Sequence, residues 1–294
     1  MGKRIRLRVA YDGTAYHGWQ VQQNGNTIEA ELARAITQVL GEEAEVIGAS
    51  RTDAGVHAYG NVAVFDTQTR IPPDKISYAL NSALPADIRV MRSEEVPADW
   101  HPRRQNCRKT YEYRIVSAGM PVPTQRLYSH YTYHAVDVPA MREAAAFFVG
   151  EHDFAALCAA GAQTQTTVRT IYAVEVEDRP LPDVFPQVRL RADEAEQACD
   201  PAREIVIRVC GNGFLYNMVR ILAGTLLDVG FGRKEASDIP AILESLDRRN
   251  AGPTLPPQGL FLMGYEYEEE AGQTPPDEGE RRNPDLPCEI CAET

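Results

Sequence analysis

Residues 4–11 read RIRLRVAY, and the alternation of basic and apolar side chains in this stretch is the strongest indication of the fold. The apolar set falls on one face of an extended chain: Ile5, Leu7, Val9 and Tyr11. A period of two residues is the pattern of a strand buried on one face. Apolar side chains then recur at helical spacing over residues 28–40. A half-buried strand followed by an amphipathic helix predicts a sheet that is covered by helices.

The same patterns predict further elements along the chain. Asn26, with Glu29 three residues later, resembles a capping box and is expected to open the first helix. In the first part of the chain we expect strands near 45–49, 59–66 and 88–96 and a helix near 73–83. In the second part we expect strands near 109–117, 168–177, 205–210 and 260–267 and helices near 139–149, 214–229 and 237–246. The order in the second part echoes that in the first.

This order of elements predicts an α+β fold. We expect two similar α/β halves joined into one extended, mostly antiparallel sheet, with helices on one side and an active-site cleft between the halves. The first half would span residues 1–104 and the second residues 105–268. Within the second half, residues 178–204 are rich in Pro, Asp and Glu and are expected to form an acidic insertion, as a loop or hairpin. Residues 269–294 have the composition of a disordered acidic tail.

Composition favours a globular protein. The 294 residues are 44% hydrophobic, which is enough to bury a substantial core. We find no apolar stretch of signal-peptide length near the start and no later run long enough to span a bilayer. Six scattered cysteines lack the density of a disulfide framework and fit reduced thiols. We therefore expect a cytoplasmic protein with no membrane association.

The net charge of -12 weighs against a nucleic-acid partner, because phosphate binding usually leaves a basic footprint. Its distribution weakens that objection: residues 266–294 and 178–204 carry -8 and -3, so the rest of the chain is close to neutral. The basic residues of that remainder gather near residues 3–8 and 103–114. These two basic strips would suit RNA, and they would equally suit two solvated strand faces.

Asp53 lies in the segment RTDAGVHA, residues 51–58, at a position that we expect to be a loop between two strands. A rigid sheet can hold a loop carboxylate towards a ligand, where it could act as a covalent catalyst. The commoner role of a loop aspartate is to cap a turn and to pair with a neighbour, here Arg51. The segment alone leaves both interpretations open.

Two more segments contain residues that suit chemistry or binding. Tyr111 and Tyr113 alternate within a predicted strand, so both rings would point to one face, either to stack on bases or to fill the core. Arg220 is a single charge in the apolar helix that follows Gly211 and Gly213. It would need a carboxylate partner if it points inwards, and it would extend to solvent if it points outwards.

No metal site or nucleotide-binding loop is indicated. Cys288 and Cys291 form a CxxC pair, but a tetrahedral zinc site needs two further ligands at suitable spacing. The glycines at 211 and 213 complete neither a dinucleotide-binding nor a P-loop pattern. An aspartate-nucleophile hydrolase of phosphate esters would need acidic metal ligands near Asp53, and its loop supplies none. We expect no metal and no cofactor.

Several segments taken together resemble the tRNA pseudouridine synthase A family. These segments are residues 11–13 (YDG), 18–20 (GWQ), 48–58, 109–113 (KTYEY), 150–154 (GEHDF), 214–220 (FLYNMVR) and 259–262 (GLFL). They occur in that family's order, and the resemblance covers about residues 4–267 apart from the acidic insertion. A chance match to this many ordered segments is far less probable than a match to any one of them.

The resemblance implies roles for four residues. Asp53 would be the nucleophile, Tyr111 the ring that packs on the target base and takes part in proton transfer, and Arg220 the ion-pair partner of Asp53. Arg51 would lie at the cleft mouth, where it contacts phosphate or fills the space left by a flipped nucleotide. A non-catalytic RNA-binding module on the same scaffold is the alternative, and the presence of Asp53, Tyr111 and Arg220 together weighs against it.

The resemblance also implies an activity. The protein would be an isomerase that converts uridine to pseudouridine at positions 38, 39 and 40 of the tRNA anticodon arm, as a homodimer and without a cofactor. Asp53 could attack the ribose anomeric carbon or add to the uracil ring. The chain departs from the family pattern at Trp100, Pro102, Cys107 and Leu255, all outside the segments that we expect to do chemistry.

Overall fold

The computed structural model describes residues 2–23, 25–161, 164–181 and 202–268. The first part of the chain forms β1 (Lys3–Tyr11), α1 (Ile28–Leu40), β2 (Ile47–Gly48), β3 (His57–Thr67), η1 (Pro73–Lys75), α2 (Ile76–Asn81) and β4 (Ile88–Val96). The middle forms β5 (Cys107–Ser117), η2 (Pro123–Gln125), β6 (His130–Thr132), α3 (Val138–Ala146), β7 (Gly150–Asp153), η3 (Ala155–Leu157) and β8 (Val168–Pro180). The last part forms β9 (Arg203–Gly211), α4 (Met218–Gly230), α5 (Asp238–Ser245), η5 (Arg248–Asn250), η6 (Pro257–Gly259) and β10 (Leu260–Tyr267).

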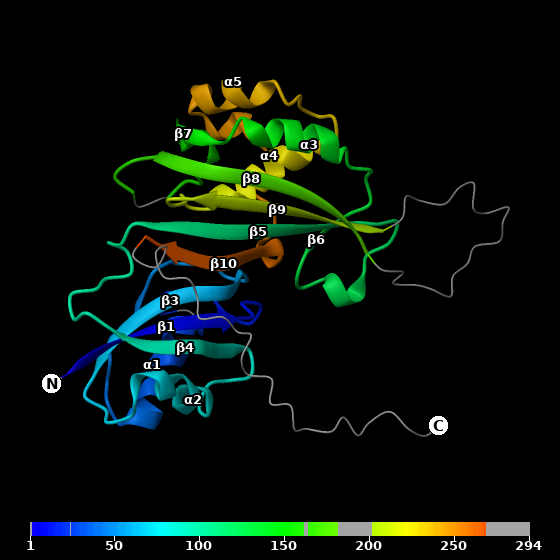
Figure 1. The fold of residues 1–294 in the computed structure, drawn as a ribbon. Coiled ribbons are helices and arrows are strands. Elements are labelled where there is room, and N and C mark those ends of the chain that lie inside the picture. Colours follow the sequence, from blue (N-terminus) through cyan, green and yellow to red (C-terminus); the bar gives the residue numbers. More distant parts are fainter. Residues whose placement is uncertain (1, 24, 162–163, 182–201, 269–294) are drawn as a thin grey trace, which may run out of the picture.

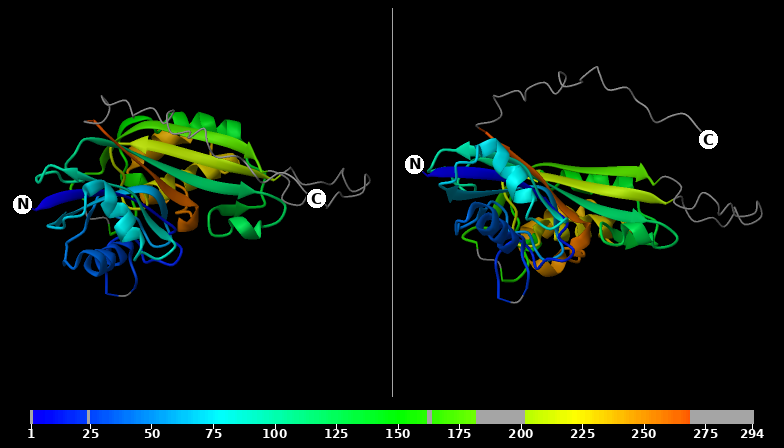
Figure 2. Two further views of the ribbon diagram at one scale, coloured as in Figure 1. Left: turned by 60° about the horizontal axis from the view of Figure 1, so that its bottom comes forward. Right: turned by 90° about the horizontal axis from the view of Figure 1, so that it is seen from below.

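The strands of the described residues form a single ten-stranded sheet (Figure 1). Its order is β4-β1-β3-β10-β5-β9-β8-β7, with β2 paired to β3 and β6 to β5. The pairings are antiparallel apart from β10 with β3 and β5 with β6. The helices lie against one face and leave the other face uncovered (Figure 2). The predicted α+β fold, with one extended and mostly antiparallel sheet, is confirmed.

The closing strand β10 lies in the middle of the sheet, between β3 and β5 (Figure 1). Leu262 pairs with Ala58 of β3 on one side and with Tyr111 of β5 on the other. Strands from the two predicted halves are therefore joined by the last strand of the described chain. The loop before β3 and the strand β5 are thereby brought together on the helix-covered side.

The core lies between the sheet and the helices, as the alternation in residues 4–11 predicts. Ile5, Leu7 and Val9 are fully buried in one cluster with the apolar stripe of α1, which includes Leu32 and Ile36. Each such side chain contributes roughly 1.5–3 kcal/mol through removal of its apolar surface from water. The arginines that alternate with them project from the uncovered face.

The predicted capping box of α1 is wrong by one residue. The N-cap is Thr27, whose hydroxyl accepts from the Ala30 amide at 3.4 Å. Asn26 instead accepts from the Thr27 amide at 3.1 Å, and Glu29 accepts from the Val21 amide at 2.7 Å. Threonine and asparagine are both good caps, so the pattern alone did not separate these adjacent candidates.

Other boundaries also differ from the prediction. The strand expected at 45–49 is only two residues long, and the helix expected at 73–83 divides into η1 and α2. The helix expected from residue 214 begins at Met218, because Asn217 has a φ of 59°, which lies outside the right-handed helical region. The short strands β6 and β7 were not anticipated.

The acidic insertion expected at 178–204 begins and ends within strands, since Asp178 pairs with Ile205 and Pro180 with Arg203. Its central part, residues 182–201, lies outside the described residues. So do the acidic tail, 269–294, and the CxxC pair within it. No helix in the described ranges combines the length and the apolar character needed to cross a bilayer.

Candidate active site

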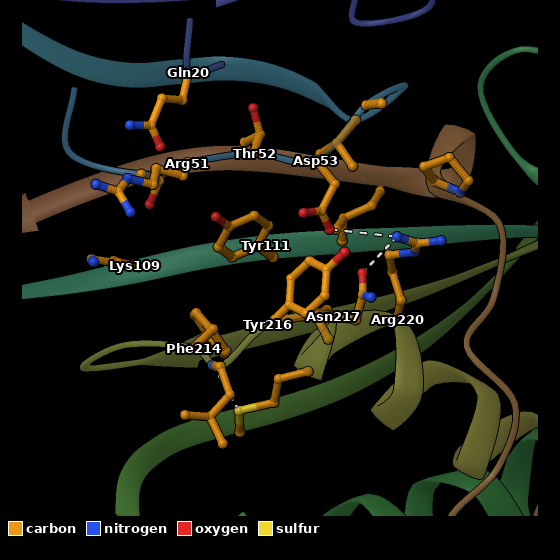
Figure 3. Close-up of a pocket in the computed structure, with 18 of the residues that line it drawn as sticks. Gln20, Arg51, Thr52, Asp53, Lys109, Tyr111, Phe214, Tyr216, Asn217 and Arg220 are labelled. Carbon is orange, nitrogen blue, oxygen red and sulfur yellow. Dashed lines mark hydrogen bonds and ion pairs between the residues drawn. The ribbon is translucent and has the colours of Figure 1, made fainter. Parts of the chain in front are cut away.

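A cavity of about 850 Å³ opens on the helix-covered side of the sheet, where the two predicted halves meet. Its walls come from the loop before β3, from strand β5 and from the start of α4 (Figure 3). Asp53, Tyr111, Arg220 and Arg51, the four residues expected to form the site, all line this cavity. Asp53 and Arg220, which are 167 positions apart in the sequence, are thus brought together in one cavity.

The loop that carries Asp53 is held by hydrogen bonds to the segment after β1. The Thr52 hydroxyl lies 2.7 Å from the Tyr11 hydroxyl, and the Thr52 carbonyl accepts from the Trp19 amide at 3.0 Å. At the other side of the turn, the Gly55 amide donates to the Tyr16 carbonyl at 3.3 Å. The backbone on both sides of Asp53 is therefore fixed by groups outside its own loop.

Two glycines allow this close packing of backbone on backbone. A Cβ atom at Gly13 would lie 2.0 Å from the Val56 carbonyl oxygen. A Cβ at Gly18, whose φ is +87°, would lie 2.5 Å from the Thr52 carbonyl oxygen. Both distances are far below van der Waals contact, so any larger residue would displace the Asp53 loop. The YDG and GWQ segments of the sequence shape the site through these contacts.

Asp53 forms an ion pair with Arg220, with 3.4 Å between the Asp53 Oδ2 and the Arg220 Nη1 (Figure 3). The guanidinium is itself fixed: Nη1 donates to the Asn217 side-chain oxygen at 2.6 Å, and Nε donates to the Leu255 carbonyl at 2.7 Å. The left-handed backbone of Asn217 places its side chain for this contact. Arg220 therefore points inwards, and Asp53 pairs with it and not with Arg51.

The environment of Asp53 favours its neutral form. Burial raises the pKa of the Asp53 carboxyl above its ordinary value, and the charge and hydrogen bond of Arg220 only partly oppose this effect. The ionised carboxylate is consequently less solvated than a surface aspartate. A desolvated carboxylate is a stronger nucleophile, and Arg220 limits the rise in pKa.

The two tyrosines of β5 have different environments: one lines the cavity, where a ring could stack on a base, and the other fills the core. Tyr111 is nearly buried, lines the cavity and meets the Phe214 ring edge-on, with 5.1 Å between centroids. Burial raises the pKa of Tyr111 to about 12, so its phenol is protonated at neutral pH. Tyr113 is fully buried, and its hydroxyl donates to the Pro256 carbonyl at 2.7 Å. Tyr113 belongs to the core, and Tyr111 faces the site.

Positive charge surrounds Asp53. Five basic side chains line the cavity: Arg51, Arg103, Lys109, Arg169 and Arg220. Among the described lining residues Asp53 is the single carboxylate. The pKa of Lys109 is lowered, chiefly by burial and further by the nearby charges of Arg169 and Arg103. Arg51, which is exposed, has no hydrogen bond or ion pair with any described residue. The cavity therefore offers unbalanced positive charge to an anionic ligand.

The basic strips seen in the sequence contribute only partly to this cavity. Of the first strip, Arg4 pairs with Asp66 and Arg6 with Glu94 on the uncovered face. Of the second, Arg103 and Lys109 line the cavity, but Arg114 pairs with the buried Glu112. The two strips therefore divide between the sheet faces, because alternate residues of a strand face opposite sides.

Sequence reasoning missed several lining residues. Arg169, on β8, carried no signal beyond its charge, and Tyr216, 47% exposed, lay in the quoted segment 214–220 without a role. Leu255 was placed outside the chemical segments, yet its carbonyl holds Arg220. Within the described ranges, no group of three or more His, Cys, Asp or Glu side chains could hold a metal ion.

Comparisons with known proteins identify the family of the chain. A model of the tRNA pseudouridine synthase family matches residues 8–103 and 144–268. A protein of Ruminiclostridium cellulolyticum named tRNA pseudouridine synthase A is 45% identical over 265 residues, covering 90% of this chain and all of the relative. A protein of the same name from Acetivibrio thermocellus is 42% identical over the same shares of both chains. The chain therefore belongs to the tRNA pseudouridine synthase family, and it is an isomerase that acts on tRNA.

Proposed function

We propose that this isomerase converts uridine to pseudouridine at positions 38, 39 and 40 of the tRNA anticodon arm, with Asp53 as the nucleophile and without a cofactor. One observation carries the assignment of Asp53. It is the only carboxylate among the described residues that line the cavity, and it lies between Arg220 and the Tyr111 ring. The positions in tRNA rest on the family resemblance.

The reaction breaks the bond between the ribose anomeric carbon and N1, and it forms a bond from the same carbon to C5. In one route Asp53 attacks the anomeric carbon, the uracil anion leaves and turns, and C5 then displaces the carboxylate. In the other route Asp53 adds to C6 of the ring and leaves after the rearrangement. In both routes the C5 proton is lost and N1 gains a proton, so the overall change is an isomerisation.

Arg220 supports either route by stabilising the ionised form of Asp53. Its guanidinium is held by the Asn217 side chain and the Leu255 carbonyl, so it does not need to reorganise when Asp53 reacts. When the carboxylate forms its covalent bond, the positive charge loses its partner, and in the first route the departing uracil carries negative charge nearby. Arg220 is placed to stabilise that charge as well.

Tyr111 offers the target base a ring face and a hydroxyl. The Phe214 edge contact fixes the orientation of the Tyr111 ring, which reduces the entropy lost when a base packs on it. Because the pKa of Tyr111 is raised to about 12, the phenol is a proton donor at neutral pH and not a ready base. Its part in proton transfer would begin with donation of that hydrogen.

The remaining basic residues suit the RNA backbone. A uridine stacked in the anticodon arm must leave the stack to reach Asp53, which costs on the order of a few kcal/mol. Contacts between phosphates and Arg51, Arg103, Lys109 and Arg169 would offset this cost. Arg51, an exposed lining residue without a partner among the described residues, can also occupy the position that the flipped base leaves.

The proposal includes a homodimer that works in the cytoplasm. The thiols of the three described cysteines, Cys107, Cys158 and Cys210, are all free, which supports a reducing compartment. The dimer rests on the family resemblance. Light scattering on the purified protein would measure its mass in solution, and a mass of a single chain would contradict the dimer.

The decisive test is direct. Purified protein is incubated with unmodified tRNA, without added metal or nucleotide, and pseudouridine is mapped along the RNA. We expect product at positions 38, 39 and 40. Product elsewhere would overturn the assigned positions, and tRNA binding without any product would favour a non-catalytic RNA-binding module.

A further inference from the structure

A buried histidine lies four residues after Asp53 and has no role in the chemistry described above. His57, the first residue of β3, is only 2% exposed. Its ring stacks on Phe261 of β10, with 4.7 Å between centroids, and meets the Tyr128 ring at 5.3 Å. Both ring nitrogens have hydrogen-bond partners, which come from distant parts of the chain.

The two partners determine which nitrogen carries the proton. The Gly13 amide donates to Nδ1 at 3.1 Å, so this nitrogen must accept. Nε2 lies 2.9 Å from the Leu127 carbonyl, which has no hydrogen to donate, so Nε2 must carry the proton. Burial lowers the pKa of His57, which favours this neutral ring. The Asp12 Oδ1 lies 3.1 Å from Nδ1 and would accept a hydrogen bond only from a ring that carries a proton on Nδ1.

Asp12 is already bound by other donors. Its Oδ1 accepts from the Thr14 amide at 3.0 Å and from the Thr14 hydroxyl at 2.5 Å. Its Oδ2 accepts from the Tyr128 hydroxyl at 2.7 Å. The carboxylate therefore does not depend on a proton from His57. The neutral ring with a proton on Nε2 satisfies the Gly13 amide and the Leu127 carbonyl.

The contact with Gly13 bears directly on Asp53. Gly13 packs against the Val56 carbonyl so closely that a Cβ atom would lie 2.0 Å from it. The Val56 amide in turn donates to the Asp53 carbonyl at 3.2 Å and closes the turn. Thr52, on the other side of Asp53, is held by Tyr11 and Trp19. The turn thus has one support before Asp53 and one after it.

We propose that His57 is a positioning residue for Asp53: its Nδ1 holds the Gly13 backbone against Val56 and so fixes the end of the catalytic turn. The inference rests on the proposed role of Asp53. The bond from Nε2 to Leu127 anchors the ring and has a smaller effect on the carboxylate. The two hydrogen bonds of His57 can be tested separately, because an Asn side chain can reproduce the bond from Gly13 and a Gln side chain the bond to Leu127.

The test compares His57→Asn with His57→Gln. The Asn oxygen falls at the position of Nδ1 and can accept from Gly13, whereas the Gln nitrogen falls at the position of Nε2 and can donate to Leu127. We expect His57→Asn to keep the single-turnover rate of pseudouridine formation within about threefold and His57→Gln to lose about tenfold or more, since small misplacements of reacting groups are costly. Both variants should bind tRNA with unchanged Kd.

Equal rates in the two variants, the opposite order, or a loss confined to tRNA affinity would overturn the proposal. A second measurement does not depend on the variants folding. Nitrogen-15 NMR of the unaltered protein at neutral pH should show a neutral His57 ring protonated on Nε2, and a ring protonated on Nδ1 would overturn the proposal. If the unaltered protein forms no pseudouridine, the proposed function fails, and the NMR result still tests the hydrogen bond.

Discussion

The two faces of the sheet carry arginines with different partners. On the uncovered face each of three arginines has a carboxylate at short range: Arg4 with Asp66 at 2.7 Å, Arg6 with Glu94 at 2.8 Å, and Arg208 with Glu112 at 2.7 Å. On the helix-covered face, Asp53 is the single carboxylate among the described residues that line the cavity, and it pairs with Arg220. The same residue type is neutralised on one face and left available on the other.

This difference shows why total charge is a poor guide to the ligand. A chain with a net charge of -12 still presents a cationic cavity, because Asp53 is the single carboxylate among the described residues that line it. Unpaired basic groups close together repel one another, and in the cavity that repulsion contributes to the lowered pKa of Lys109. An RNA phosphate would reduce this repulsion. The repulsive free energy among the basic groups of the free protein therefore favours RNA binding.

The largest effect should come from Asp53, the one carboxylate among the described residues that line the cavity. Asp53→Asn removes the nucleophile and should reduce the single-turnover rate by more than about a thousandfold, with tRNA affinity little changed. Folding stability at neutral pH should not fall. The folded-state pKa of Asp53 is raised, so its ionisation opposes folding at pH values above the ordinary pKa, and Asn is never ionised.

A rapid assay at saturating enzyme and a thermal unfolding curve would check this prediction. Asp12→Asn is not a suitable control because Asp12 contacts the His57 network, whereas Asp66→Asn changes a carboxylate on the uncovered face. If Asp53→Asn retained activity, Asp53 would not be the nucleophile. The helix-covered face could then not be distinguished as the catalytic face of the sheet.

Removal of the counter-ion should have the next largest effect. Arg220→Ala should lower the rate on the order of a hundredfold, the usual cost of losing one preorganised charge-stabilising donor. It should also shift the pH dependence. Arg220 lowers the pKa of Asp53, so without it that pKa rises further, and activity should be lost at a higher pH as the solution is acidified.

The pH profile of the single-turnover rate, measured alongside tRNA affinity, separates this role from binding. Arg220→Lys keeps the charge but cannot hold both Asn217 and Leu255, so it should show a smaller shift of the acid limb than Arg220→Ala. An unmoved acid limb, or equal losses of rate and affinity, would contradict the role of Arg220 as the partner of Asp53.

A smaller effect, on binding, should come from Lys109. Lys109→Met keeps the apolar stem and removes the charge, so tRNA affinity should fall, and the slope of log affinity against log salt should lessen by about 0.7–1. Titrations over a range of potassium chloride concentrations would measure it. Lys109→Arg is the matched control and should retain the slope of the unaltered protein.

The smallest effect on binding should come from the uncovered face. Arg4→Ala breaks an ion pair with the exposed Asp66, which is worth at most about 1 kcal/mol of unfolding free energy. Its salt-dependent tRNA affinity should equal that of the unaltered protein. A salt slope reduced as much by Arg4→Ala as by Lys109→Met would show that RNA covers both faces, and the comparison would then fail.

Much of the fold followed from local patterns. The buried face of β1, the stripe of α1 and the bounds of β4 and β10 all agree with the alternation or periodicity of their residues. Local patterns were least reliable at ends and short elements. There a single left-handed residue such as Asn217, or a choice between two good caps at 26 and 27, decides the boundary.

The sequence by itself determined which residues could act, because Asp53, Tyr111 and Arg220 stand in segments of recognisable composition and order. Only the tertiary structure decided how they are arranged. In the folded chain, β10 lies between β3 and β5. Tyr111 lines the cavity, whereas Tyr113 is buried in the core, and Arg220 forms an ion pair with Asp53. The tertiary structure also separated paired from unpaired arginines. The reason is physical: periodicity is a property of neighbouring residues, whereas burial, charge pairing and pKa depend on groups that only folding brings together.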